Sequence, residues 1–470
     1  MPFQSHTNLP LLPQSQSQKS RQSQTKQARQ KEEWSLSPHD YALVDRNTFT
    51  PQPKAEIQDK AFFMQDEQQV LQARWDMLRR EKQEVFASYY LFDGNRLGRI
   101  ALAELRQAAQ RGARVRLVVD QVAVDAWRDE KIDLYTLKAL QEDGVEIRQF
   151  HPVSFYNPMH YFDWRSYSRL HDKLLYLGGQ QVLFTGDRNM QNFNFRSQNS
   201  KGKRGMSYRS VEVMTQGSMV EEVLPRMEQV WAESQPYVLE NLDTRMVDRA
   251  RMHLERALAW AQERFPTNPA NWADTLQPVN RIEFVGDNPA LKGQVFPIDE
   301  RVIHMIQLAK QKIVIMSPYI NLSRLYRRLL QEAIGRGVEV QLITASRASN
   351  DNGFSFCIFS TQVKALRKMG IKIFYHQGPD FLHAKMFVVD EEKVLLGAHN
   401  FNHRSTYNDV ESGVIIRDRL WVKRQIGAFL GQIRRESNTL PDEKPQTLGQ
   451  CLSFAGGRIM RMIPWWWKQW

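Results

Sequence analysis

Apolar residues along the chain alternate between strand-like runs and helical spacing, and this order occurs twice. The run VFASYYLF, which begins at Val85, is short, apolar and aromatic, as expected of a buried strand. The segment LGRIALAELRQAAQRG has helical spacing and ends at Gly112, and ARVRLVVD after it predicts another strand. The same order returns in IVIMSPYINL, in LYRRLLQEAIGRG ending at Gly337, and in VEVQLITAS. This repetition predicts two α/β units, each with a mostly parallel or mixed sheet.

The repeat defines the expected domain organisation. We expect the two copies at 84–240 and 300–435, because each also contains a second helix and a short strand, GVEIRQF or GIKIFYH. The segment 241–299 between them predicts a helical linker followed by a loop rich in Asn and Pro. Residues 34–83 predict a helical lead-in. Its apolar positions from about 60 to 82 have the spacing of one amphipathic helix, at Phe63, Val70, Leu71, Trp75 and Leu78.

The two ends of the chain differ in composition from the repeats. Residues 1–33 are rich in Gln and Ser with scattered Lys and Arg, which is typical of a disordered basic arm or of a plain solvated tail. Residues 436–470 end in CLSFAGGRIMRMIPWWWKQW, which combines three adjacent Trp with Arg458, Arg461 and Lys468. We expect this tail to associate with a membrane surface, the alternative being that its Trp residues pack on the folded body.

The overall composition is that of a globular protein with an anionic partner. The chain has 470 residues, 42% of them hydrophobic, and a formal net charge of +12. Basic proteins of this kind bind nucleic acid or acidic lipid surfaces. The two Cys exclude a disulfide framework, and no apolar run in the sequence has membrane-spanning length. The N-terminal residues have no apolar core, so we expect no signal peptide. A reducing compartment is therefore the expected location.

Two related runs of residues contain the candidate chemistry. The run HAKMFVVDEEKVLLGAHN holds His383, Lys385, Asp390, Gly397, Ala398 and Asn400. The run HDKLLYLGGQQVLFTGDRN holds His171, Lys173, Gly186 and Asn189. A His and a Lys two residues apart lie on the same face of a strand. An imidazole can attack phosphorus or protonate a leaving oxygen, while an ammonium and an amide can hold the anionic oxygens. Two such sets predict a nucleophile and an acid for phosphoryl transfer without a metal.

These two runs resemble the duplicated motif of the phospholipase D superfamily. The second run matches closely and continues to Glu411, 28 residues after His383, with Ala398 where Ser or Gly is more usual. The first run is looser, because Gly178 stands in place of the motif Asp and the sequence GDRN comes one residue late. Its acid, Glu212, follows His171 by 41 residues. We expect both half-sites to be active nevertheless, and expect Gly178→Asp to be near neutral for the reaction rate if the strand already holds Lys173 correctly.

The resemblance implies a fold and a set of roles. It implies an α/β chain with two phospholipase D-like α/β/α domains in a pseudo-twofold arrangement around one active site. His171 would be the nucleophile and His383 the acid and base, with Asp390 in the catalytic set. Phosphate would be held by the motif lysines and asparagines, Lys173, Lys385, Asn189 and Asn400. Glu212 and Glu411 would orient the imidazoles.

The resemblance also implies an activity, although the acceptor alcohol stays open. The copies look most like bacterial cardiolipin synthases, so we expect a phosphatidyltransferase that forms cardiolipin or a related phospholipid through a phosphohistidine intermediate. The alternatives are a phospholipase D-type hydrolase, a nuclease, a phosphatidylserine synthase and a non-catalytic binding module. We expect no cofactor and no metal. The expected partners are an anionic phospholipid such as phosphatidylglycerol and a membrane surface, with nucleic acid as the alternative. We expect a monomer in the cytoplasm, peripherally associated with the inner membrane.

Overall fold

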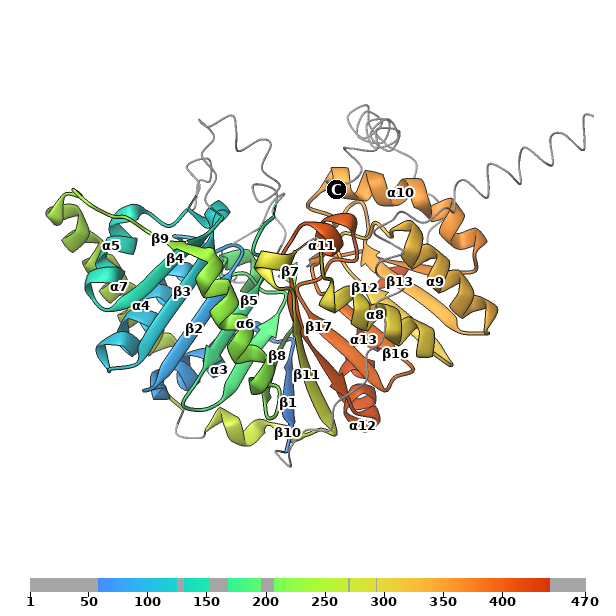
Figure 1. Ribbon diagram of the computed structural model, residues 1–470, viewed down its shortest axis with the longest axis horizontal. Coiled ribbons are helices and arrows are strands. Elements are labelled where there is room, and N and C mark those ends of the chain that lie inside the picture. Colours follow the sequence, from blue (N-terminus) through green and yellow to red (C-terminus); the bar gives the residue numbers. More distant parts are fainter. Residues whose placement is uncertain are drawn as a thin grey trace, which may run out of the picture.

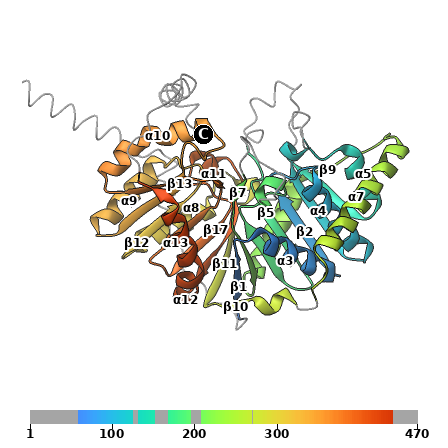
Figure 2. The ribbon, with the colours of Figure 1, turned by 180° about the vertical axis from the view of Figure 1, so that it is seen from behind.

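The chain folds into two α/β halves whose sheets lie side by side, as the two opposite views in Figures 1 and 2 show. The computed structural model describes residues 58–124, 131–151, 168–195, 207–268, 271–292 and 294–439. The basic arm, the segment 34–57 and the Trp-rich tail from residue 440 lie outside the described residues, so the predictions made for them remain predictions.

The first half is built on a nine-stranded mixed sheet with the order β10-β1-β8-β6-β5-β2-β3-β4-β9. Strands β2, β3 and β4 are parallel, and the others pair antiparallel. In chain order the strands are β1 (Lys60–Met64), β2 (Glu84–Tyr89), β3 (Arg114–Asp120), β4 (Val145–Phe150), β5 (Lys173–Leu177), β6 (Val182–Gly186), β8 (Glu212–Gln216), β9 (Ser234–Pro236) and β10 (Gln277–Pro278).

The second half repeats this plan on an eight-stranded sheet with the order β11-β18-β17-β16-β12-β13-β14-β19. Its strands are β11 (Arg281–Gly286), β12 (Lys312–Met316), β13 (Glu339–Ala345), β14 (Lys372–His376), β16 (Met386–Val389), β17 (Lys393–Gly397), β18 (Ser412–Arg417) and β19 (Ser437–Asn438). Strand by strand, β11 corresponds to β1, β12 to β2 and β16 to β5. The predicted α/β repeat is confirmed.

Helices cover both sheets. Those of the first half are α3 (Glu67–Arg80), α4 (Arg96–Gln110), α5 (Leu134–Glu142), α6 (Val220–Glu233) and the linker helix α7 (Thr244–Arg264). Those of the second half are α8 (Pro297–Leu308), α9 (Arg324–Gly335), α10 (Gly353–Lys368), α11 (His403–Tyr407), α12 (Arg419–Trp421) and α13 (Gly427–Arg435), with a π-helical turn at Val422–Ile426. Short 3-10 turns occupy Gln121–Ala123, Asn192–Phe195, Trp272–Thr275 and Pro289–Leu291.

The repeated helices begin and end for the same local reasons. The side chain of Asn95 accepts the backbone N–H of Gly98 at the start of α4, and Ser323 accepts that of Tyr326 at the start of α9. Beyond each helix stands a glycine with positive φ, Gly112 at +97° and Gly337 at +90°. A side chain would be strained in this conformation, which explains why the sequence signal for the helix ends was reliable.

Each copy starts earlier than the sequence pattern predicted. The helix expected over about 60–82 is a strand, β1, followed by a shorter helix, α3. Similarly, β11 lies in the range predicted as linker and loop and pairs along its whole length with β18. Both are edge or near-edge strands that pair with a strand more than 100 residues away in sequence. Their conformation is therefore set by tertiary pairing, which outweighs the local sequence pattern.

The two halves share an apolar core across their interface. One continuous cluster of buried side chains contains Phe63 and Val213 from the first half together with Ile282, Val414 and Phe429 from the second. The rings of Phe63 and Phe429 meet edge to face, with centroids 5.7 Å apart. Because this interface is buried and apolar, the halves are held in one relative position, which the site described next requires.

Candidate active site

The backbone at each motif histidine is held by the opposite half. The N–H of His383 donates to the carbonyl of Arg209 (2.9 Å), next to the short parallel pair β7 (Tyr208–Arg209) and β15 (Phe381–Leu382). In the other half-site the N–H of His171 donates to the carbonyl of Val410, also at 2.9 Å. These two crossings are equivalent under the repeat. Each histidine therefore reaches its position only when the halves have docked.

The imidazoles are oriented across the same interface. Nδ1 of His171 lies 2.8 Å from Oε2 of Glu411, and Nδ1 of His383 lies 2.8 Å from Oδ2 of Asp187. All four side chains are buried. A carboxylate accepts the Nδ1–H in each case, which leaves the lone pair of Nε2 available for chemistry. The structure thus brings His171 and Glu411 together as predicted, and adds Asp187, which the sequence analysis missed.

Glu212 does not orient an imidazole, contrary to the prediction. It makes a bidentate ion pair with Arg74, with Nε–Oε1 2.6 Å and NH2–Oε2 2.8 Å, and both side chains are buried. The strand register gives the reason. Glu212 pairs with Gly186, whereas Gly413 pairs with the equivalent Gly397, so Glu212 stands two positions beyond the place of Glu411. That is roughly 7 Å along the strand.

The first half supplies its acid from the neighbouring strand instead. The position equivalent to Glu411 is Ser210, which is buried and whose hydroxyl has no hydrogen-bond partner among the described residues. The position equivalent to Asp187 is Ala398. Each half therefore places one carboxylate at this point. In the first half it is Asp187, directly after β6, whereas Ser210 before β8 has none. In the second half it is Glu411, directly before β18, whereas Ala398 after β17 has none. The available signal was the acid in GDRN, where the second copy has GAHN.

The two motif lysines lie beside the imidazoles and are buried. Nζ of Lys173 donates to the carbonyl of His171 (2.6 Å), and Nζ of Lys385 donates to the carbonyl of His383 (2.8 Å) and to its Nε2 (3.0 Å). Burial lowers the pKa of Lys173 to about 7 and that of Lys385 to about 8. Each amine therefore titrates near physiological pH, and a bound anion would stabilise its charged form.

The same surroundings lower the pKa of both histidines. Burial is the largest cause, followed by the nearby Lys173 for His171 and by Lys385 for His383, whose pKa falls to about 4. The lysine of the opposite half contributes as well, Lys385 for His171 and Lys173 for His383. Burial alone would raise the pKa of Asp187, but the hydrogen bond and charge of His383 hold it below its ordinary value. The two half-sites are therefore one electrostatic unit.

The motif asparagines follow strands β6 and β17, next to the histidine strands. Asn189 is buried, and its side-chain oxygen accepts the N–H of Leu91 at 3.3 Å. Asn400 is also buried, its backbone N–H donates to the hydroxyl of Ser405, and its side-chain oxygen has no partner among the described residues. This places both amides at the ends of strands next to β5 and β16, while their contact with a phosphate remains a prediction.

Contrary to the prediction, Asp390 is not part of the catalytic set, because it lies at the opposite end of β16 from His383. Its carboxylate accepts the backbone N–H groups of Lys310, Gln311 and Lys312, at 2.8 to 2.9 Å, and so organises the turn that enters β12. A residue seven positions along an extended strand is roughly 23 Å from the first, which excludes direct contact. Its role is to hold the scaffold.

In the first half, Glu81 supplies the carboxylate that Gly178 lacks. The N–H of Gly178 donates to the carbonyl of Glu84, as that of Asp390 does to Lys312, so the two positions are equivalent. The carboxylate of Glu81 accepts the N–H groups of Lys82, Gln83 and Glu84, the counterparts of the three that Asp390 holds. An acid from elsewhere in the chain thus caps the same turn. Gly178 is therefore no sign of a degenerate half-site.

This replacement predicts that Gly178→Asp is destabilising in the native background. A Cβ at Gly178 would stand 3.0 Å from Cβ of Glu84, and the added carboxylate would compete with Glu81 for the same amides. We expect each of Gly178→Asp and Glu81→Ala to lower the free energy of unfolding by about 1–3 kcal/mol, and the double variant to recover much of this loss. Denaturant unfolding measures all three, and Gly178→Ala separates crowding from charge. Additive losses in the double variant would contradict the exchange of roles.

Aromatic rings that the sequence analysis did not assign line both imidazoles. The ring centroid of Tyr90 lies 5.1 Å from that of His171, and that of Tyr208 lies 5.1 Å from that of His383. The hydroxyl of Tyr208 donates to Asp351 (2.5 Å), which also accepts the hydroxyl of Tyr319 (2.6 Å). This bridge again joins the two halves, since Tyr208 belongs to the first and Asp351 to the second.

Comparison with known proteins identifies the family. A family model described as "Cardiolipin synthase, PLD-like domain" matches residues 76–201 and 302–433, more than half of the chain. The chain belongs to this phospholipase D-like family. The curated relatives include cardiolipin synthase C of Escherichia coli (strain K12), which is 25% identical over 390 residues, covering 73% of this chain and 78% of the relative. Cardiolipin synthase 1 of Staphylococcus epidermidis (strain ATCC 35984) is 23% identical, covering 77% of this chain and 66% of the relative.

The fold is shared with a solved structure as well. The crystal structure of phosphatidylserine synthase from Haemophilus influenzae Rd KW20 superposes with a TM-score of 0.65 at 14% identity, covering 91% of this chain and 98% of that one. The two phospholipase D-like halves are therefore the fold of this enzyme of the phospholipase D superfamily. Among the described residues no helix has the length and apolar character needed to cross a membrane, and no three His, Cys, Asp or Glu side chains form a candidate metal site.

Proposed function

We propose that this enzyme is a phosphatidyltransferase that forms cardiolipin or a related phospholipid through a phosphohistidine intermediate. The observation that carries the proposal is the pair of histidines, each oriented at Nδ1 by a carboxylate of the opposite half and each accompanied by a buried lysine. Such a pair supplies a nucleophile and an acid on one phosphodiester. The names of the curated relatives support the phospholipid as substrate.

In the first proposed step, Nε2 of His171 attacks the phosphorus of a phosphodiester such as phosphatidylglycerol. The bond between phosphorus and the headgroup oxygen breaks, and His383 in its imidazolium form gives its Nε2 proton to that oxygen. Glu411 stabilises the positive charge that develops on His171. Lys173 and Lys385 stabilise the negative charge on the equatorial oxygens of the pentacoordinate phosphorus. The products of this step are the free alcohol and a phosphatidyl group bound to His171.

In the second proposed step, the acceptor hydroxyl loses its proton to neutral His383. The acceptor oxygen then attacks phosphorus, and the bond between phosphorus and Nε2 of His171 breaks, returning the electron pair to the imidazole. A lipid alcohol as acceptor gives cardiolipin, whereas water gives phosphatidic acid. Each step moves one proton through His383, so the histidine returns to its starting form after the cycle.

The asymmetry between the imidazoles supports this assignment of roles. Nε2 of His383 accepts a hydrogen bond from Lys385, whose pKa is lowered to about 8, so a proton donor stands beside the nitrogen that must become protonated. A phosphodiester between the two lysines would raise the pKa of His383 from its value of about 4, because negative charge favours the imidazolium. His171, held at Nδ1 by Glu411, then attacks in its neutral form.

The lysines make anion binding dependent on pH. An ammonium attracts an anion only below its pKa, so attraction should fade as pH rises through about 7 for Lys173 and about 8 for Lys385. We expect the Kd for tungstate, a phosphate analogue, to rise roughly tenfold or more between pH 6.5 and 8.5, measured by calorimetry. Lys173→Arg, which stays charged, should flatten this dependence. A Kd that is constant over this range would contradict the lysine assignment.

The decisive test of the function uses purified protein and labelled lipid. Vesicles of phosphatidylglycerol should yield cardiolipin and release glycerol, and rapid denaturation in SDS at neutral pH, where the phosphorus–nitrogen bond survives, should leave label on the protein. Phosphatidic acid as the sole product would identify a hydrolase, and cleavage of plasmid DNA in a parallel reaction would identify a nuclease. Either result would overturn the transferase proposal. We further propose peripheral membrane association through the Trp-rich tail, which requires that the protein, but not a 452–470 deletion, co-sediments with these vesicles.

A further inference from the structure

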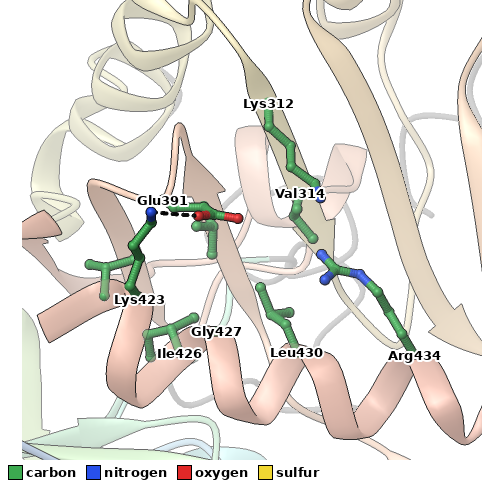
Figure 3. Close-up of a pocket in the computed structure, with 10 residues that line it drawn as sticks. Lys312, Val314, Glu391, Lys423, Ile426, Gly427, Leu430 and Arg434 are labelled. Atoms are coloured by element: carbon green, nitrogen blue, oxygen red, sulfur yellow. Dashed lines mark ion pairs between the residues drawn. The ribbon is translucent and has the colours of Figure 1, made fainter. Parts of the chain in front are cut away.

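A pocket apart from the histidine site lies on the second half, between helix α13 and strands β12 and β16 (Figure 3). Its volume is about 320 Å³. Pockets for small ligands begin at about this size. The floor is apolar and formed by aliphatic side chains of the sheet and of the helix that covers it, namely Val314, Val388, Val422, Ile426 and Leu430. The pocket therefore offers space to a small ligand, above apolar side chains that are at most 4% exposed.

The rim of this pocket is positively charged. Lys312, Lys423 and Arg434 line it together with a single acid, Glu391, whose carboxylate lies 3.7 Å from Nζ of Lys423. Figure 3 shows the ammonium of Lys312 and the guanidinium of Arg434 turned toward the same space above Leu430. Nζ of Lys312 lies 3.9 Å from a carboxylate oxygen of Glu339, which also pairs with Lys372 at 3.3 Å. Arg434 donates to the neutral side chain of Gln341. The balance of charge at the rim favours an anion.

The first half has larger side chains at the equivalent positions and provides an internal comparison. Val314 pairs with Val388 in the second sheet, as Phe86 pairs with Tyr176 in the first. Arg434 precedes Ser437 by three residues, as Trp231 precedes Ser234, and both serines begin equivalent edge strands. There Arg116 lies over the rings of Phe86 and Trp231, with 5.3 and 5.4 Å to their centroids. Aromatic rings thus stand in the first half at positions where the second half has two valines and Arg434.

The charges differ between the halves in the same way. In the first half Arg116 is neutralised by two carboxylates, Glu84 at 2.6 Å and Glu228 at 2.7 Å. Glu84 is the counterpart of Lys312, because both stand at the first position of the equivalent strands. The second half thus has a base at the rim where the first half has the acid Glu84. It also has two valines in the floor where the first half has Phe86 and Tyr176, and Arg434 at the rim where the first half has Trp231. A stable core is the simplest use of this space, as the first half shows, so the open cationic form needs another explanation.

The helix above the pocket departs from α-helical geometry where it contacts the pocket. The turn Val422–Ile426 is π-helical, and three of its residues, Val422, Lys423 and Ile426, line the pocket. Such turns occur frequently at functional sites. The pocket is separate from the histidines, because Val388 stands five residues after His383 on an extended strand, roughly 16 Å away.

We propose that this pocket binds an anionic amphiphile, a phosphate or phosphate ester joined to a short apolar chain, at a site distinct from the catalytic histidines. Lys312 and Arg434 hold the anionic head, and the chain lies on Val314, Val388 and Leu430. The proposal rests on the pocket, its rim charges and the larger side chains at the equivalent positions of the first half. It stands independently of which phosphodiester the enzyme transforms.

The test is direct binding of octyl phosphate below its micellar concentration, measured by calorimetry on the full-length Lys173→Gln, Lys385→Gln variant, whose histidine site lacks the two lysines that attract an anion. We expect saturable binding of one equivalent, at least tenfold tighter than for inorganic phosphate or for 1-octanol. Equal binding of inorganic phosphate would reduce the site to a simple anion site, and equal binding of octanol would remove the role of the cations. Either result, or no saturable binding, would overturn the proposal. The same headgroup presented in vesicles tells whether a bilayer or a free molecule is the source.

Two variants and a matched control locate the binding. Lys312→Gln with Arg434→Gln should weaken octyl phosphate binding at least tenfold. Val314→Phe with Val388→Tyr, which copies the floor of the first half, should abolish it while preserving the fold. Lys372→Gln removes a neighbouring cation that shares Glu339 but does not line the pocket, and should leave the affinity unchanged. If the filled variant, shown to be folded by its melting curve, still bound octyl phosphate, the pocket assignment would be wrong.

Discussion

His171→Ala and His383→Ala are each expected to reduce phosphatidyl transfer by at least roughly a thousandfold, and the double variant should be no worse than either single one. The reason is geometric. Each imidazole is held by a carboxylate of the opposite half, so the two histidines act on one phosphorus as a single unit. When either histidine is removed, the remaining one cannot complete the transfer alone. Turnover of labelled phosphatidylglycerol under single-turnover conditions measures the loss.

Two controls separate chemistry from folding in this experiment. His304→Ala, on helix α8 of the second half, should retain activity, and all variants should keep the melting temperature of the parent within a few degrees. Only variants with His171 intact should trap the phosphatidyl group on the protein. If His171→Ala kept substantial activity, the first half-site would be dispensable. If the trapped label depended on His383 and not on His171, the two roles would have to be exchanged.

Asp187→Asn is expected to lower the rate roughly a hundredfold to ten-thousandfold, and adding Ser210→Glu should restore part of it. Asparagine still offers an oxygen to the N–H of Val211, which Asp187 now accepts at 2.6 Å. Its amide, however, would face Nδ1 of His383 with a donor and force the wrong tautomer. Ser210 occupies the place of Glu411, so a glutamate there should supply the missing carboxylate as it does in the second half. The rate and its pH profile measure both effects.

The controls for this exchange use the residues that the sequence pattern suggested. Ser210→Ala alone should stay within a few-fold of the parent rate, because its hydroxyl has no partner among the described residues. Glu212→Gln should weaken the buried pair with Arg74 and lower stability without moving the pH profile. Full activity of Asp187→Asn would remove Asp187 from the site. Absence of any recovery in the folded double variant would refute the equivalence of Ser210 and Glu411.

The sequence alone was sufficient for the elements that local pattern specifies. The repeated strands and helices from Val85 to Gly112 and from Ile313 to Gly337 are confirmed, because buried strands and glycine-terminated helices carry their signals within a few residues. The strands β1 and β11 were missed for the opposite reason. Each is a short strand at or next to a sheet edge, and it forms only by pairing with a segment far away in the chain.

The site shows the same division between local and distant information. His171, Lys173, His383 and Lys385 were found because His-x-Lys on a strand is local, and the structure brings all four together. Which acid serves which histidine could not be read from spacing, since the insertion before Tyr208 hides the register. One step of register moves a side chain to the other face of a sheet, and two steps move it roughly 7 Å.

By itself the sequence determined that this protein has two copies of an α/β unit, each with one His-x-Lys strand, because periodicity and motif letters are properties of neighbouring residues. Only the tertiary structure decided that Asp187 and Glu411 cross the interface to the imidazoles, that Glu81 replaces the missing acid at Gly178, and that one half keeps an open cationic pocket. All three depend on distances between residues remote in sequence. Such distances are set by the docking of the two sheets and by strand register, which chain order does not contain.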